Sequence, residues 1–365
     1  MALRTVLLRP LLALLVAVLA SATACAEETD LPWTLNAYFE NDLFGETDRN
    51  YTNGIRLSWT SPDLSSYERD ETLPQWLRDS NDFLHFFHDR SLLKRCSRAR
   101  REHSGDDCLS RNLVVSAGQL IYTPDNIEQK TLVETDRPYA GYLYLGFAYH
   151  TRSDTKLDTI EFNIGIVGPA SLGREAQDFI HELRDFETFK GWDNQLDNEL
   201  GLGVLYEHKR RLFRRTLFNG MLQQDLIAHA GMSLSNVATY LNGGFEYRLG
   251  RFLPDDFGTA SVRPGGDSAS PGRNDPRLRR NFLSGVHFFV ATDARWVARD
   301  IFLDGNSFEN SHSIDKHRAV ADISLGMNFI SGRWKFSYAQ VWRSKEYKRQ
   351  PHSHEYGSMT VSYVF

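Results

Sequence analysis

The chain has 365 residues, of which 42 are Lys or Arg and 47 are Asp or Glu, giving a formal net charge of −5 at pH 7. This acidic balance argues against nucleic acid as a partner, because proteins that bind it present a basic patch. Beyond the first 26 residues, no window is apolar enough to form a transmembrane helix.

The beginning of the chain predicts export. Arg4 and Arg9 form a basic segment, residues 11–19 ("LLALLVAVL") form an apolar run too short to span a bilayer, and residues 24–26 ("ACA") offer a small-residue cleavage site. This pattern predicts a signal peptide over the first 26 residues. Residues 27–365 then form one domain, because no Pro/Gly/Ser-rich linker divides them in the middle.

Three cysteines bear on the compartment. Cys25 would be the modified residue of a lipoprotein, an alternative disfavoured by Ala22, which replaces the usual Leu three positions earlier. Cys96 and Cys108 would remain after cleavage, and an even, closely spaced pair in an oxidising compartment favours a local disulfide over two free thiols.

Apolar and polar residues alternate with period two along most of the remaining chain, which indicates half-buried strands. We expect twelve strands, at roughly 33–43, 51–61, 111–123, 139–151, 157–167, 199–212, 218–234, 237–249, 281–295, 317–329, 334–343 and 354–365. Long loops are expected at 62–110 and 250–280, the first with a helix packed under the sheet.

The last residues, "GSMTVSYVF", place an aromatic residue at the very end of an alternating strand. Such an ending resembles the assembly signal of outer-membrane barrels, so we expect the barrel assembly machinery as a partner. The fold class predicted is all-β, a monomeric transmembrane antiparallel barrel of about twelve strands. A secreted β-sandwich would alternate too. An even strand number places both ends of the barrel in the periplasm and the connections after odd-numbered strands outside.

Between the fifth and sixth strands the period changes to that of an amphipathic helix. Its apolar stripe, which we expect to lie on the barrel rim, consists of Ala176, Phe179, Ile180 and Leu183. Gln177, His181 and Arg184 form another stripe. From the spacing alone, His181 is either a solvated surface residue or half of a site.

Five motifs spread over the chain resemble the lipid A 3′-O-deacylase family of Gram-negative outer membranes. They are "END…YTNG" (40–54), "QLIYTP" (119–124), "DRPYAGYLY" (136–144), "VGPASLG…AQDFIHELRDFETFKGWDNQLDNE" (167–199) and "RDIFLDGNSFENSHSIDK" (299–316). The resemblance implies a calcium-dependent, twelve-stranded outer-membrane barrel. Its members hydrolyse the ester that holds the 3′-linked acyloxyacyl group on lipid A, the lipid part of lipopolysaccharide.

The resemblance also implies the site. The family's catalytic histidine falls on His181, with Gln177 four residues before it, and Asn41 and Thr52 join them as catalytic residues. Asp42 falls on the first of two expected calcium ligands. A neutral histidine can take a proton from water near pH 7, and carboxylates are the ligands that calcium prefers.

The other implied residues are the second calcium ligand, Glu187, and the cations that bind substrate. The family's basic residues after "YTP" have no direct match, and this chain offers only Lys130 and Arg137 for the lipid A phosphate. By strand parity, Asp42 and Thr52 share the lumen-facing side, whereas Asn41 has the opposite parity unless a bulge turns it. Because lipid A occupies the outer leaflet, the site is expected at the outward-facing rim.

Two other functions remain open. An outer-membrane phospholipase using Ser and His would need a His-x-Ser-Asn-Gly context, but "SHSID" (311–315) lacks the Asn-Gly. A non-enzymatic barrel, either a porin or an adhesin, would need none of the site residues.

Overall fold

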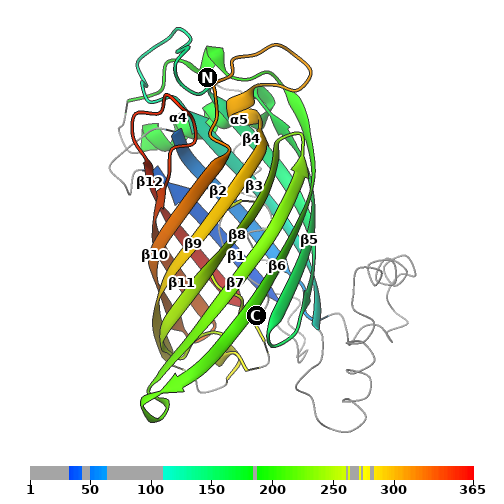
Figure 1. The fold of residues 1–365 in the computed structure, drawn as a ribbon, viewed down its shortest axis with the longest axis vertical. Coiled ribbons are helices and arrows are strands. Elements are labelled where there is room, and N and C mark those ends of the chain that lie inside the picture. The colour runs from blue at the N-terminus through cyan, green and yellow to red at the C-terminus, as the bar shows by residue number, and fades with distance from the viewer. Residues whose placement is uncertain are drawn as a thin grey trace, which may run out of the picture.

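Twelve antiparallel strands close into a barrel in chain order, with β1 hydrogen-bonded to β12 (Figure 1). The computed structural model describes residues 33–42, 50–63, 110–183, 187–259, 262–263, 271–272, 274–279 and 283–365. The strands are β1 (Thr34–Asn41), β2 (Asn50–Thr60), β3 (Ser110–Thr123), β4 (Ala140–Arg152), β5 (Lys156–Val167), β6 (Glu199–Leu217), β7 (Leu222–Ser235), β8 (Ala238–Arg251), β9 (Ser284–Asp300), β10 (Ala319–Ser331), β11 (Trp334–Arg343) and β12 (His354–Val364). The predicted fold class is confirmed.

Short helices occupy the connections. They are η4 (Pro169–Ser171), α4 (Gly173–Leu183), η5 (Trp192–Asn194), η6 (Phe218–Gly220), η7 (Pro276–Leu278) and α5 (Ile301–Asp304). The predicted amphipathic helix is α4. None of the helices in the described residues is long and apolar enough to cross a membrane.

The hairpin of β6 and β7 differs most from the predicted bounds. Its turn was expected within 213–217, in a basic run, but β6 continues through that run to Leu217. A register shift between Arg211 and Phe213 accommodates the extra residue. A β-bulge of this kind leaves no mark on the sequence pattern.

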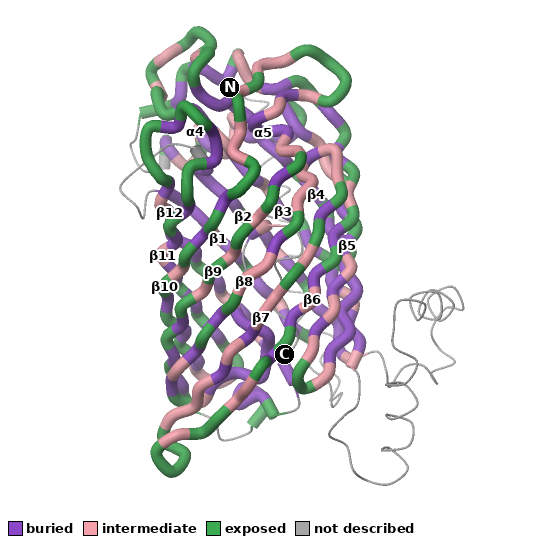
Figure 2. The backbone as a smooth tube through the Cα atoms, in the orientation of Figure 1, coloured by how far each residue is buried: buried purple, intermediate pink, exposed green. Residues whose placement is uncertain are grey.

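Buried and exposed residues alternate along the strands (Figure 2). The exposed residues are the apolar ones, which is the inverse of a water-soluble sheet. On β5, Phe162 and Ile164 are 53% and 46% exposed, whereas Glu161 and Asn163, which alternate with them, point into the lumen and are buried. Large apolar side chains face outward on the other strands too, among them Leu145, Leu202, Phe245 and Leu325. An apolar belt around a polar lumen is the pattern of a membrane barrel, and it excludes a β-sandwich with an apolar core.

The two ends of the barrel differ in the length of their connections. Residues 153–155, 218–221 and 332–333 make short turns at the end where the N–H of Phe365 donates to the carbonyl of Trp33, at 3.0 Å. The connections at the other end, which include those that carry α4 and α5, are longer apart from residues 236–237 between β7 and β8 (Figure 1). Short turns mark the periplasmic side. The predicted signal peptide, the helix expected within 62–110 and the Cys96–Cys108 pair lie outside the described residues.

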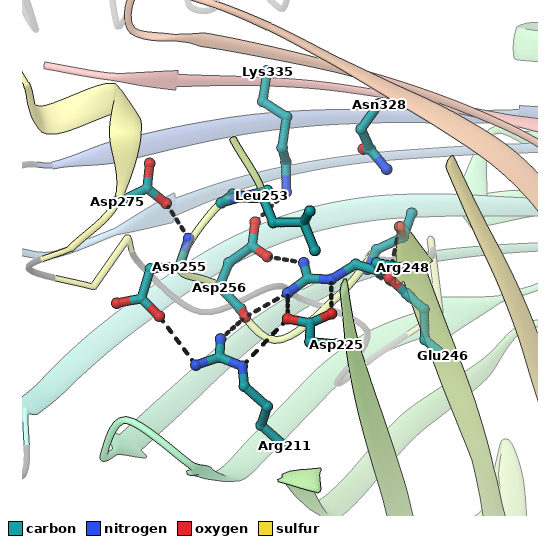
Figure 3. A network of polar contacts seen from close by, with 12 residues as sticks. Arg211, Asp225, Glu246, Arg248, Leu253, Asp255, Asp256, Asp275, Asn328 and Lys335 are labelled. Atoms are coloured by element: carbon teal, nitrogen blue, oxygen red, sulfur yellow. Dashed lines mark hydrogen bonds and ion pairs between the residues drawn. The ribbon is translucent and has the colours of Figure 1, made fainter. Parts of the chain in front are cut away.

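The connection from β8 to β9 does not hang below the barrel but enters the lumen. Asp256 on this segment accepts from Lys335 of β11 at 2.6 Å and from Arg248 of β8 at 2.5 Å (Figure 3). Arg248 also pairs with both carboxylate oxygens of Asp225, at 2.8 and 2.6 Å. We call the described residues 253–259 and 262–263 the lumen plug. Its length, unusual for a periplasmic turn, follows from this position.

Burial and charge act in opposite directions on Asp256. Burial alone would raise the pKa of its carboxyl, but Lys335, Arg248 and Arg277 lower that pKa well below its usual value. The ionised form is therefore the stable one, because three cations surround it in a space without bulk water.

We expect Asp256→Ala to lower the free energy of unfolding by about 3–5 kcal/mol, because it leaves buried cations without their counter-charge. Urea unfolding in lipid vesicles, followed by heat-modifiable gel migration, measures this. A depressed pKa contributes stability that is fully present above the unfolded value and lost only as pH falls through the folded one. The loss should therefore be the same at pH 5 and pH 7. The exposed pair of Asp315 and Lys348 provides the control: Asp315→Ala should cost less than about 1 kcal/mol.

Candidate active site between the wall and a rim helix

Glycines allow α4 to lie directly on the outer face of the barrel wall. A Cβ on Gly141 of β4 would stand 2.1 Å from the hydroxyl oxygen of Ser171 and 3.0 Å from the Cα of Gly173. The side-chain amide of Gln119 on β3 donates to the carbonyl of Ser171 at 2.7 Å. The turn before α4 is thus fixed to the outward-facing residues of two neighbouring strands.

An apolar cluster closes the space between α4 and the wall. It comprises Ile121, Tyr139, Phe189 and Trp192, with Ile127 and Ala176 packed against it. Trp192 is fully buried, and its ring centroid lies 5.0 Å from that of Tyr139. The segment after α4 therefore returns to the same patch of wall on which the helix begins.

His181 lies in this closed space and is only 2% exposed. Its Nδ1 is 2.5 Å from the backbone carbonyl oxygen of Glu187, and its Nε2 is 2.9 Å from the side-chain nitrogen of Gln177. A carbonyl can only accept, so Nδ1 carries the proton and Nε2 accepts from the Gln177 amide. The ring of Phe189 meets the imidazole edge-on, with centroids 5.3 Å apart. The geometry selects the tautomer in which Nε2 is the basic nitrogen.

The prediction that the apolar stripe of α4 lies on the rim holds for Ala176, which packs against the apolar cluster, but not for Phe179 or Ile180. The buried stripe consists of Gly173, Gln177 and His181, whereas Phe179 is 49% exposed and Ile180 is partly exposed. The side chain of Leu183 and all of Arg184 lie outside the described residues. A polar stripe faces the wall because the hydrogen bonds of His181 are made within the helix and the segment that follows it.

The facing part of the site comes from the ends of β1 and β2. The register of β2 against β3 shifts between Tyr51 and Asn53. Thr52 is the residue left over, and its hydroxyl lies 2.6 Å from that of Thr123. Tyr51 still points into the lumen, so the bulge turns Thr52 to the opposite side. The predicted lumen-facing parity of Thr52 is therefore wrong.

The strand parity predicted Asn41 and Thr52 on opposite sides of the wall. The bulge places both on the outward-facing side. Asn41 belongs to the outward set of β1 and pairs across the strands with Asn53. Asn53 pairs in turn with Ile121, which packs in the cluster under α4. Asn41, Asp42, Thr52 and Asn53 are all at most 3% exposed. The register thus places the ends of β1 and β2 beside the strand that carries Ile121, the residue packed under α4. Asp42 directly follows β1, and its lumen-facing parity stays a prediction.

The two cations predicted to bind substrate separate in the structure. Lys130 is exposed on the β3–β4 connection, where its carbonyl accepts from Asn194 at 2.8 Å. Arg137 is 1% exposed and pairs with Glu346 at 3.4 Å, with its guanidinium 4.9 Å from the ring centroid of Tyr122. Burial alone would lower the pKa of Arg137, but Glu346 raises it. Glu346 compensates its charge inside the barrel mouth, but none of its guanidinium nitrogens has a hydrogen-bond partner within the described residues.

The oxygen atoms at the site suit a hard cation. Among the described residues, no three His, Cys, Asp or Glu side chains cluster as metal ligands. Asp42 is fully buried, and the buried amide oxygens of Asn53 and Gln177 have no hydrogen-bond partner within the described segments. Glu187 is exposed beside His181. One or two carboxylates with amide oxygens make a ligand set typical of calcium.

The closed barrel with its apolar belt defines the class as an outer-membrane β-barrel. The chain belongs to the LpxR family: the model described as outer membrane protein LpxR matches residues 11–365. That family consists of lipid A 3′-O-deacylases, so the chain is an outer-membrane hydrolase of lipid A.

A solved structure supports the fold. LpxR from Salmonella typhimurium is similar with a TM-score of 0.63 and 17% identity, over 91% of this chain and 100% of that one. The β domain of the Bordetella autotransporter BrkA gives a TM-score of 0.43 at 8% identity, over 92% and 99% of the two chains. None of the curated proteins compared with the chain matches it.

We expect Gly141→Val to abolish deacylation while the barrel still folds, because the new side chain would displace Ser171 and the start of α4. Mass spectrometry of lipid A measures activity, and heat-modifiable migration measures folding. Gly243→Ala is the matched control, since its Cβ would meet only one backbone oxygen at an ordinary 3.4 Å. Full activity of the Gly141 variant would show that α4 need not dock on β4.

Proposed function

We propose that the chain removes the 3′-linked acyloxyacyl group of lipid A by water attack on the ester, with His181 as the general base. The observation that carries this proposal is the tautomer of the buried imidazole. The carbonyl of Glu187 holds the proton on Nδ1, so Nε2 is the basic nitrogen, and it can accept a proton from water once the Gln177 amide gives up its place there. No covalent acyl intermediate is needed.

Gln177 has two tasks in this scheme. In the resting site its amide N–H occupies Nε2 at 2.9 Å. When a water molecule takes that place, the Gln177 side chain lies next to it. Its Oε1, an oxygen without a partner in the described segments, can then accept a hydrogen bond from the second O–H of the water. The water is then oriented by Gln177 and deprotonated by His181, and the proton passes on to the leaving sugar oxygen.

Asp42 and Glu187 would hold calcium, with the amide oxygen of Asn53 as a further ligand. Calcium held by these residues would supply a Lewis acid for the ester carbonyl. Asn41 supplies an amide N–H and Thr52 a hydroxyl toward the same patch, and such donors stabilise a developing oxyanion. Lys130, the exposed one of the two predicted substrate-binding cations, would bind the lipid A phosphate. Arg137 instead pairs with Glu346 inside the barrel mouth.

The phospholipase alternative receives no support from its candidate residues. Nε2 of His312 lies 2.7 Å from the backbone carbonyl oxygen of Asp136, so this histidine joins two extracellular connections. Ser313 beside it is exposed on the loop. Water activation by His181 is therefore the better account of the hydrolase.

His181→Ala should lower deacylation by a factor of roughly 100 to 10,000, the usual contribution of a general base. Mass spectrometry of lipid A from cells that express each form would show the loss of the acyloxyacyl group only with the unaltered chain. Gln177→Ala should retain more activity, because it orients the water without taking its proton. Labelling and inactivation by a serine-directed inhibitor would contradict water activation.

Chelation of divalent metal should abolish activity, and calcium should restore it. Asp42→Asn should raise the calcium concentration needed for half-maximal activity by tenfold or more, about 1.4 kcal/mol, because one charged ligand becomes neutral. The control is Asp193→Asn, an exposed carboxylate near α4 that pairs with Arg174. Full activity in excess chelator would contradict the assignment of Asp42 and Glu187.

A further inference from the structure

Glu40, Tyr51 and Gly54 belong to the "END…YTNG" motif, yet the proposed reaction uses none of them. All three lie on the lumen side of the wall, behind the site. The hydroxyl of Tyr51 donates to the Glu40 carboxylate at 2.9 Å, and Ser358 of β12 donates to the same carboxylate at 3.1 Å. Glu40 is 4% exposed and Tyr51 is 3% exposed.

The tip of the lumen plug completes this arrangement. The backbone N–H of Val262 donates to Glu40 at 3.1 Å, and the carbonyl of Val262 accepts from Tyr144 of β4 at 2.9 Å. Val262 itself is fully buried. A Cβ on Gly54 would stand 1.9 Å from the Tyr51 hydroxyl and 3.0 Å from the side chain of Val262. The missing side chain of Gly54 therefore makes room for both.

Arg263 anchors the same tip to two further strands. Its carbonyl accepts from Arg56 of β2 at 2.6 Å, and its guanidinium pairs with Glu207 of β6 at 2.8 Å. Arg56 is in turn fixed by Glu161 of β5 at 3.2 Å. The plug tip is thus tied to the β2 wall from the lumen side by hydrogen bonds and charges, and its position is set by residues far from the site.

We propose that the plug tip is the inner support of the active site, with Glu40 and Tyr51 as positioning residues. Glu40 directly precedes Asn41 and Asp42, and Tyr51 directly precedes Thr52. Because neighbouring residues of a strand point to opposite sides, a bond that fixes Glu40 or Tyr51 in the lumen also fixes the side chains on the outer wall. This inference rests on the proposed function for the roles of those outer residues.

We call the hydrogen-bonded set of Glu40, Tyr51, Val262 and Arg263 the clamp. The open space beside it shows why the contact with Val262 matters. A lumen cavity of about 170 Å³ is lined by Glu40, Tyr51, Arg263 and Tyr356, among others. Packing alone therefore leaves Glu40 and Tyr51 room to move toward the cavity. The hydrogen bond from Val262 and the pairing of Arg263 with Glu207 hold them against the wall.

The test uses full-length protein in vesicles containing lipid A and two variants that loosen the clamp from opposite sides. Glu40→Ala removes the acceptor, and Arg263→Ala removes the anchor to Glu207 without touching β1 or β2. Each should lower kcat about tenfold and leave KM within twofold, because small displacements of reacting groups slow the chemical step. Glu40→Gln, which still accepts from Val262, should restore most of kcat. Asp158→Asn is the control, a carboxylate on β5 that pairs with His208 at 2.8 Å, away from the clamp.

Hydrogen–deuterium exchange gives a readout that does not depend on catalysis. Amides of residues 50–54 should exchange faster in Glu40→Ala and Arg263→Ala than in the unaltered chain or Asp158→Asn. If the variants exchange faster but the unaltered chain itself has no deacylase activity, the clamp is supported and the proposed function is contradicted. Unchanged kcat and exchange in Arg263→Ala would overturn the clamp while leaving His181 as the base. If Glu40→Ala does not fold, Tyr51→Phe replaces it with the same expected results.

Discussion

The inversion of polarity across the wall is the constraint on which the rest of the structure depends. A strand that crosses a bilayer turns its apolar side chains outward, so its polar ones face a narrow lumen. Arg56, Glu161 and Arg248 are all at most 1% exposed there. Burying a charge without a partner is costly. Each of these side chains therefore has a partner of opposite charge.

The lumen plug follows from the same constraint. The charged side chains of the strands find further partners of opposite charge on the segment after β8. That segment brings in Asp255, Asp256 and Arg263. This segment occupies part of the lumen and pairs there with residues of several strands. The plug thereby gives the wall a fixed inner surface.

The sequence predicted the twelve strands because lipid imposes strict alternation, as Phe162 and Ile164 show on β5. It did not predict the side on which Thr52 lies, because the bulge is visible only in the contact with Thr123, a partner 71 residues away. The burial of Arg137 depends on Glu346 in the same way. Local patterns report the solvent on each side of a strand, whereas these features depend on which distant segments meet.

The helix α4 shows where a familiar rule changes its meaning. An apolar stripe predicts a buried face when the surroundings are water. On the outer wall of a membrane barrel the surroundings are partly lipid, and a half-exposed Phe179 is no longer costly there. The polar stripe with Gln177 and His181 can then turn toward the wall, where hydrogen bonds to protein replace those to water. The apolar side of the helix is then left for the lipid around the barrel, and the imidazole is held by Gln177 and the carbonyl of Glu187. The filled lumen and the buried His181 under the rim helix therefore follow from one arrangement, in which polar groups turn toward protein and apolar ones toward lipid.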